Sequence, residues 1–216
     1  MSEHVMVIAP HPDDEAIGCG GTLCLHRERG DPVHVVFLTS GEAGLPDLAP
    51  EAVWTIREAE GQEAAKVLDV GHVDFLRLPD LGLDDNISVA AEGVRAILET
   101  YPADLIYLPH PGESHPDHEA VLPIVRAALA PPLANAPPEL RAYEVWSPMT
   151  QHDWVEDISH VMRRKLSAIR CYRSQLEVIR YDRAVRGLNR YRGILHAAGR
   201  YAEAFQYYES SALTSH

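Results

Sequence analysis

Two short segments of the sequence concentrate side chains that bind metal ions or move protons. Residues 10–15 read Pro-His-Pro-Asp-Asp-Glu, and residues 109–119 read Pro-His-Pro-Gly-Glu-Ser-His-Pro-Asp-His-Glu. Imidazole and carboxylate groups are ligands for zinc and related metals, and they also act as general acids and bases. The two segments therefore indicate metal-assisted chemistry.

The first segment predicts two metal ligands and a base. Proline favours the first position of a helix, so Pro12 predicts a helix entrance at which His11 and Asp14, three residues apart, converge on one cation. Asp13 then points elsewhere, close enough to hydrogen-bond a water on that cation, which is the position of a general base. Alternatively, the three acids only stabilise the helix N-terminus through its dipole. That alternative does not account for a histidine between two prolines.

The second segment repeats this arrangement. His115 precedes Pro116, which again can begin a helix, and His118 follows three residues after His115. If two strand ends bring the segments together, His11, Asp14 and His118 form a three-ligand set that suits zinc with a fourth position open to water. An open position predicts a catalytic site rather than a structural one.

His115 remains free in this interpretation to hold a proton near the developing oxyanion. A carboxylate such as Asp117 would orient it. The same donor set also accepts iron, cobalt or manganese, so the residues favour zinc without excluding other ions.

The elements that would position these groups follow from the hydrophobic pattern. Short runs rich in Val, Ile and Leu predict buried strands at residues 5–9, 33–38, 73–76 and 105–108. Helical spacing lies between them at residues 15–29, 52–70 and 89–101. This βαβαβαβ order predicts an α/β fold, a Rossmann-like, mostly parallel sheet with helices on both faces and ligands at the carboxyl ends of the strands. We expect a single domain spanning residues 1–216.

The remainder of the chain has weaker signals. A helix is expected at 116–130, a proline-rich loop at 131–138, a strand at 142–146 and a helix at 160–172. The last forty residues are rich in Arg and Tyr with weak periodicity, and the strand order beyond the loop stays open.

Composition limits the function classes. The 216 residues carry 19 Lys and Arg against 32 Asp and Glu, a formal charge of −13, so the basic footprint of a nucleic-acid-binding protein is missing. With 24% charged residues and no secretory signal pattern, we expect a cytoplasmic protein with no membrane partner. The three cysteines lack CxxC spacing, which argues against a disulfide framework. A small-molecule substrate is the better prediction.

The two segments also resemble the signatures of the PIG-L/LmbE-like family of zinc-dependent N-acetylglucosaminyl deacetylases. The resemblance lies in residues 9–15, in 18–22 (Gly-Cys-Gly-Gly-Thr) and in 115–118 (His-Pro-Asp-His). It extends to residues 39–42, Arg57, Glu58, Glu60, Lys165, Ser174 and Gln175.

The resemblance implies roles for individual residues. It implies that His11, Asp14 and His118 bind the metal, that Asp13 is the general base, and that His115 is an electrostatic or acid partner. It further assigns three residues to substrate binding: Glu42, Arg57 and Asp80.

Within this family, residues 187–193 and 201–205 are similar to the bacillithiol-biosynthesis branch, which removes acetate from N-acetylglucosaminyl-malate. Relatives of that branch assemble as hexamers built from trimers, so a homo-oligomer, a trimer or hexamer, is expected. The tail would form that interface or cap the active site of its own chain.

The expected reaction is hydrolysis of an acetamide by metal-activated water, with the leaving amine protonated by Asp13 or His115. Other substrates stay open: a chitin oligosaccharide, an antibiotic precursor or a thiol conjugate cleaved by an amidase. A metal-storing or sugar-sensing protein without turnover is a further alternative. It would need no base beside the metal, and Asp13 argues against it.

Overall fold

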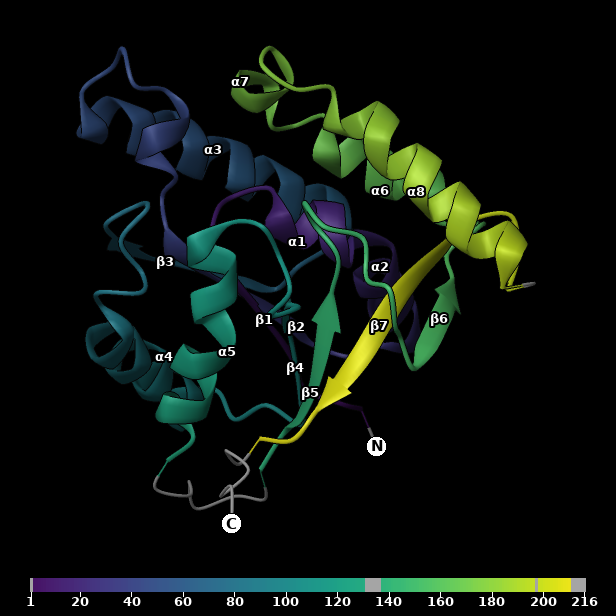
Figure 1. The fold of residues 1–216 in the computed structure, drawn as a ribbon, viewed down its shortest axis with the longest axis horizontal. Helices are drawn as coiled ribbons and strands as arrows, with labels where there is room; N and C mark the ends of the chain where they lie inside the picture. The colour runs from purple at the N-terminus through teal and green to yellow at the C-terminus, as the bar shows by residue number, and fades with distance from the viewer. Residues whose placement is uncertain (1, 131–136, 197, 211–216) are drawn as a thin grey trace.

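A seven-stranded sheet, in the order β3-β2-β1-β4-β5-β7-β6, forms the centre of the computed structural model (Figure 1). The structure describes residues 2–130, 137–196 and 198–210. Five strands are parallel: β1 (Val5–Ala9), β2 (Val33–Thr39), β3 (His72–Leu78), β4 (Leu105–Pro109) and β5 (Glu139–Tyr143). Two further strands, β7 (Ala202–Tyr208) and β6 (Trp154–Asp157), continue the sheet beyond β5.

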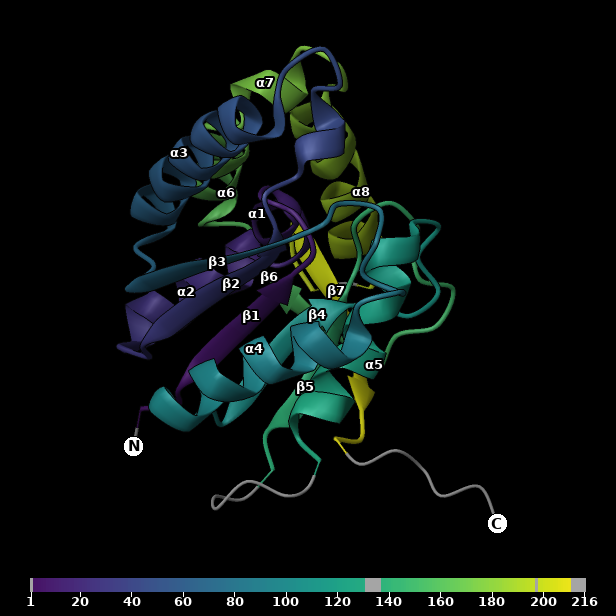
Figure 2. The same cartoon turned by 90° about the vertical axis from the view of Figure 1, so that its left-hand side faces the viewer.

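Helices cover both faces of this sheet (Figure 2). One face carries α1 (Asp14–Gly18), α2 (Gly20–Arg29), α3 (Pro50–Leu68), α6 (Met162–Ile169), α7 (Arg173–Leu176) and α8 (Tyr181–Leu195). The other carries α4 (Ile87–Thr100) and α5 (Pro116–Ala128), and a short 3₁₀ turn, η1 (Glu42–Gly44), follows β2.

Alternation along the strands explains why both faces are covered. In β1, Val5, Val7 and Ala9 pack in one core cluster, whereas Met6 and Ile8 pack in the other. A parallel strand that is apolar on both sides must be buried on both sides, which the two layers of helices provide. The predicted α/β, mostly parallel architecture is confirmed.

The strand order creates the place for a site. The chain leaves β1 through α1 and α2 toward β2, whereas β4 lies on the other side of β1 and is followed by α5. Connections therefore diverge at the neighbouring carboxyl ends of β1 and β4, the position at which open α/β sheets bind ligands. Both predicted segments begin there.

The helix expected at 15–29 is broken into α1 and α2 at Cys19, which has φ of −129°. The glycines on either side of the break are closely packed. A Cβ atom on Gly18 would lie 2.1 Å from the Tyr143 ring, and one on Gly21 would lie 2.7 Å from the Ile158 side chain.

Beyond α5 the expectations are less accurate. The strand predicted at 142–146 is shifted to β5, because the backbone amides of Val145 and Trp146 donate to the Glu113 carboxylate instead of to a strand. Strands β6 and β7 and helix α8 were not predicted. The proline-rich loop falls at residues 131–138, of which 131–136 lie outside the described residues. Among the helices that the structure describes, none has the length and apolarity needed to cross a membrane.

Candidate metal centre and active-site cavity

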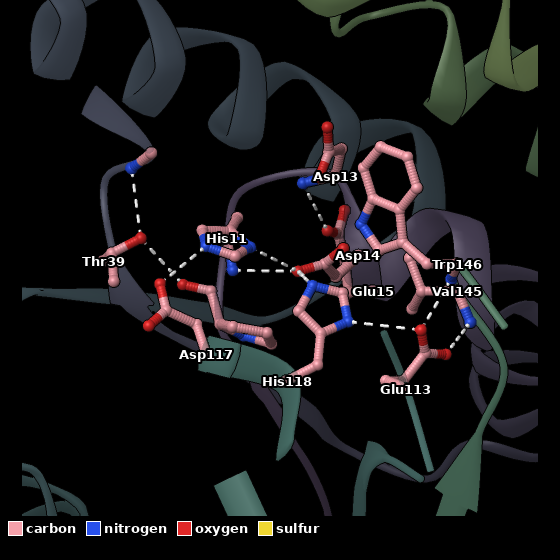
Figure 3. Close-up of polar contacts among 12 residues, drawn as sticks. His11, Asp13, Asp14, Glu15, Thr39, Glu113, Asp117, His118, Val145 and Trp146 are labelled. Carbon is pink, nitrogen blue, oxygen red and sulfur yellow. Dashed lines mark hydrogen bonds and ion pairs between the residues drawn. The ribbon is translucent and has the colours of Figure 1, made fainter. Parts of the chain in front are cut away.

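Three predicted ligands meet at the carboxyl ends of β1 and β4 (Figure 3). His11 and Asp14 lie between β1 and the start of α1, and His118 lies in the first turn of α5. Asp14 Oδ2 lies 3.1 Å from His11 Nδ1 and 3.3 Å from His118 Nε2, and all three residues are buried. The predicted convergence of the two segments is therefore present.

This arrangement fits a metal ion. Atoms bound at about 2.0–2.1 Å to one tetrahedral ion lie about 3.4 Å from each other, close to the two observed separations. His118 Nε2 is buried without a hydrogen-bond partner among the described residues, a costly state that an ion would relieve. Two imidazoles and one carboxylate are a donor set that zinc accepts with an open position.

The second nitrogen of His11 is held by carboxylates. His11 Nε2 lies 3.2 Å from Asp117 Oδ2 and 3.1 Å from Asp80 Oδ1, which leaves Nδ1 as the lone-pair atom that faces Asp14. The Asp117 oxygens also accept the backbone amides of Leu81 and Leu83. The expected contact of Asp117 with His115 is wrong, because these three donors occupy its carboxylate.

Sequence reasoning missed Glu113, which lies on the opposite side of His118. Its oxygens accept the backbone amides of Val145, Trp146 and Ser147 at 2.7–3.0 Å, and Oε2 lies 3.8 Å from His118 Nδ1 (Figure 3). The available signal was its place two residues before the His-Pro-Asp-His motif, in a segment to which no role had been assigned.

Asp13 adopts a strained backbone conformation beside the ligands. Its φ is 131°, a region that non-glycine residues rarely enter and that costs of order 1–3 kcal/mol. The conformation is held by Glu15 Oε2, which accepts the Asp13 amide at 3.2 Å, and by Arg57, which donates to the Pro12 carbonyl and lies 3.4 Å from Asp13 Oδ2.

Burial raises the pKa of Asp13 to about 7, and the Arg57 guanidinium opposes this rise. A cation held by His11 and Asp14 would also oppose this rise in the pKa of Asp13 and favour the carboxylate form. The neighbouring Glu15 is also buried, its pKa is raised to about 8, and it accepts a hydrogen bond of 2.6 Å from the Tyr172 hydroxyl.

His115 lies at the mouth of this cluster. Its ring centroid is 4.9 Å from those of His11 and His118, and its buried Nδ1 has no partner in the part of the chain that the structure describes. All three histidines offer a nitrogen within 4.8 Å of the others. Burial, followed by the charges of His11 and His118, lowers the pKa of His115, so its imidazole is mainly neutral at pH 7.

Two of the three residues assigned to substrate binding line a cavity of about 240 Å³ above the ligands. Arg57 and Asp80 line it, but Glu42 does not, because its oxygens accept the Asp80 amide at 2.9 Å and the Trp54 indole N–H at 3.4 Å. The prediction for Glu42 is thus corrected to a support of Asp80. The other lining residues are His11, Asp13, Asp14, Ile17, Gly41, Ala43, Gly44, Leu81, His115, Val145, Trp146, Gln175 and Tyr181.

Comparisons with known proteins agree with this geometry. Residues 6–129, more than half of the chain, match the model of the PIG-L family, described as GlcNAc-PI de-N-acetylase. The chain is 31% identical over 188 residues to the "probable N-acetyl-alpha-D-glucosaminyl L-malate deacetylase 2" of Bacillus subtilis, covering 82% of this chain and 85% of that protein. It is 30% identical over 187 residues to the diacetylchitobiose deacetylase of Thermococcus kodakarensis, covering 79% and 69%.

A solved structure shows the same fold. The N,N'-diacetylchitobiose deacetylase from Pyrococcus horikoshii superposes with a TM-score of 0.84 at 26% identity, covering 99% of this chain and 88% of that one. The family match includes both segments of the candidate metal centre, from His11 to His118. The chain therefore belongs to the PIG-L family and is a deacetylase, a hydrolase of acetamides.

Proposed function

We propose that this chain removes acetate from an N-acetylglucosaminyl conjugate with the help of a bound zinc ion, and that N-acetylglucosaminyl-malate is its first candidate substrate. The observation that carries the proposal is the carboxylate of Asp13 beside the convergent His11, Asp14 and His118. The relative from Bacillus subtilis supports the choice of substrate.

His11, Asp14 and His118 would hold the metal, and iron or cobalt is a chemical alternative to zinc. When bound, the ion would lower the pKa of a water molecule and polarise the acetyl oxygen. Asp117 would act as a positioning residue, because its carboxylate fixes the orientation of the His11 ring.

Asp13 takes the proton from the attacking water. Arg57 and Glu15 hold the Asp13 carboxylate and amide, so the base is fixed before substrate binds. Asp13 then gives this proton to the leaving amine, either directly or by way of the neutral His115 imidazole, whose Nδ1 is free for a ligand.

Substrate binding falls to the groups that line the first cavity. Arg57 is the one Arg or Lys among its described lining residues, so it is the group that would receive a carboxylate of malate. Asp80 Oδ2 accepts the Ala43 amide, and Oδ1 faces His11, so a sugar hydroxyl would donate to Asp80 beside the metal.

A second candidate is deacetylation of a chitin-derived sugar, which the relative from Thermococcus kodakarensis favours. The two candidates differ in charge, since only the malate conjugate requires a cation in the cavity. Comparing both substrates on one preparation therefore distinguishes them.

The experiment measures primary-amine release from N-acetylglucosaminyl-malate, N-acetylglucosamine and diacetylchitobiose, with zinc-loaded and chelator-treated protein. We expect release from the malate conjugate that stops on chelation and returns with zinc. Asp13→Asn should keep one zinc per chain by elemental analysis but lose at least about a hundredfold in kcat, the usual weight of a general base.

Asp85→Asn, an exposed acid on the β3–α4 loop, is the matched control and should retain full activity. No release from any of the three substrates would contradict the proposal. Equal loss of zinc and of activity in Asp13→Asn would identify Asp13 as a ligand instead.

A further inference from the structure

A second cavity of about 210 Å³ adjoins the first. The two share the wall formed by Ile17, Val145, Trp146 and Tyr181. The second cavity extends along α8, and its remaining lining residues are Gly18, Glu144, Pro148, Ala184, Val185, Leu188, Asn189 and Ala204. It therefore opens beside the acetamide site rather than elsewhere on the molecule.

The second cavity has no free charge among its described lining residues. Its carboxylate, Glu144, is neutralised: Oε1 accepts the Met149 amide at 2.6 Å, and both oxygens accept hydrogen bonds from the buried Arg192 guanidinium. Most other lining side chains are apolar. A carboxylate placed here would lose its hydration without gaining a cation, which is unfavourable.

One polar atom in this apolar lining is unsatisfied. Asn189 is 3% exposed, and its Nδ2 donates to the Ala202 carbonyl at 3.0 Å, whereas its buried Oδ1 has no hydrogen-bond partner among the residues described. An orphaned buried acceptor is rare in native proteins and commonly marks a missing ligand or water. A ligand group carrying one N–H or O–H donor would satisfy it.

Size and shape indicate a ring or a branched chain. An apolar cavity of about 150 Å³ already holds a benzene molecule, so about 210 Å³ admits a six-membered ring with one substituent. The rings of Trp146 and Tyr181 meet edge to face with centroids 5.7 Å apart, and both residues line the two cavities. A molecule with its acetamide at the metal centre can extend past this aromatic pair.

We propose that the second cavity binds an apolar group, aryl or branched alkyl, that bears one hydrogen-bond donor and belongs to the same molecule whose N-acyl amide is hydrolysed. This inference rests on the proposed deacetylase function. The chain would thus act on N-acyl amino sugars with an apolar extension, while a malate group would stay near Arg57. The extension is joined to the sugar either through the glycosidic oxygen or through the acyl group.

Paired substrates test the proposal. The 4-hydroxyphenyl glycoside of N-acetylglucosamine should have a KM at least about tenfold below that of the methyl glycoside, since burying an aryl ring removes much apolar surface from water. N-(4-hydroxybenzoyl)glucosamine, compared with N-acetylglucosamine, is the second arm. A lower KM in only one of the two comparisons identifies the side of the sugar that faces the second cavity. Unchanged KM values in both comparisons overturn the proposal.

Variants on α8 locate the effect. Leu188→Trp fills the cavity and should remove the tenfold preference, whereas Leu195→Trp, on the same helix but 62% exposed, should leave turnover and preference unchanged. Asn189→Leu should abolish any difference in KM between the 4-hydroxyphenyl glycoside, which carries the hydrogen-bond donor, and the phenyl glycoside, which lacks it. If Leu188→Trp lowers the melting temperature, Leu188→Phe is the milder filling. A preference that survives a folded cavity-filling variant contradicts the proposal.

Binding is measured separately from turnover. Calorimetry with the 4-hydroxyphenyl glycoside and chelator-treated protein should give a dissociation constant that Leu188→Trp weakens about tenfold and Leu195→Trp does not. Such binding without deacetylation would refute the proposed function and keep the second cavity. Deacetylation of the methyl glycoside without aryl-selective binding would keep the function and refute the second cavity.

Discussion

At the scale of single residues, Asp117 and Glu113 lie beside the second ring nitrogens of His11 and His118. Asp117 contacts His11 Nε2, and Glu113 faces His118 Nδ1. Carboxylates placed on the second nitrogen fix the tautomer and ring orientation of a metal-binding histidine, and they raise its basicity. Both acids also bind backbone amides, so each connects a ligand to a loop.

Replacing Glu113 with Gln should weaken both functions. The Gln amide group cannot accept all three backbone amides, so we expect a loss of about 1–3 kcal/mol in the free energy of unfolding. Zinc affinity, measured by competition with a chelator, should fall about tenfold to hundredfold. Glu119→Gln, an exposed acid on α5 next to His118, is the control. Equal behaviour of the two variants would show that Glu113 does not support His118.

Asp117→Asn tests through which histidine Asp117 acts. Because its carboxylate contacts His11, we expect zinc affinity to fall about tenfold or more, together with kcat. Competition with a chelator measures the first and amine release the second. If zinc affinity is unchanged and only the NMR titration of His115 moves, Asp117 acts on His115, contrary to the geometry.

At the scale of elements, the break between α1 and α2 is stabilised from a distant strand. Glu203 of β7 accepts the amides of Gly21 and Thr22 at 2.8 Å and the ammonium group of Lys165 at 2.5 Å. Both charged residues are buried. The N-terminus of α2 is therefore joined to β7 and α6 at once.

Glu203→Leu should be strongly destabilising. It leaves the Lys165 charge buried without its partner, for which we expect a loss of about 3–5 kcal/mol, measured by urea denaturation of the metal-free protein. The exposed pair of Arg173 and Glu63 offers a control, because Glu63→Gln should change stability by less than about 1 kcal/mol. Similar losses in the two variants would contradict this assignment.

These contacts show which parts of the structure the sequence can predict. The convergence of His11, Asp14 and His118 was predictable, because the two segments that carry them follow apolar strands, and parallel strands end at the same edge. Glu203 was not, since its partner Gly21 is 182 residues away and only tertiary packing joins them. Likewise, Val145 continues an apolar run of the sequence, but the backbone amide of Val145 donates to the Glu113 carboxylate and not to a neighbouring strand.

At the scale of the whole molecule, α8 presents two different faces. Tyr181, Val185 and Leu188 line the second cavity, whereas Tyr191, Ile194 and Leu195 are 56%, 54% and 62% exposed. Through Tyr181, α8 also lines the cavity above the candidate site, which agrees with one of the two roles expected for the tail. Its outer face retains large apolar side chains, a feature of surfaces that bind other proteins.

A homo-oligomer stays a prediction, and this outer face is where we place its interface. Light scattering after size-exclusion chromatography should give a mass several times 24.0 kDa. Ile194→Glu combined with Leu195→Glu should lower that mass toward the monomer, because charges would be buried without partners. Ile56→Glu, an exposed apolar position on α3, is the control. A monomeric wild-type protein would contradict the prediction.

The residues of the reaction centre and those of the second cavity come from different parts of the sequence. The residues proposed as metal ligands and base, and those that contact them, lie within residues 6–129, whereas the second cavity is built largely by residues 144–148 and by α8. Strand β7 folds back beside β5 and brings that later part of the chain to the reaction centre. Mutations in the C-terminal third can therefore diversify substrate selectivity during evolution while the hydrolytic machinery stays intact.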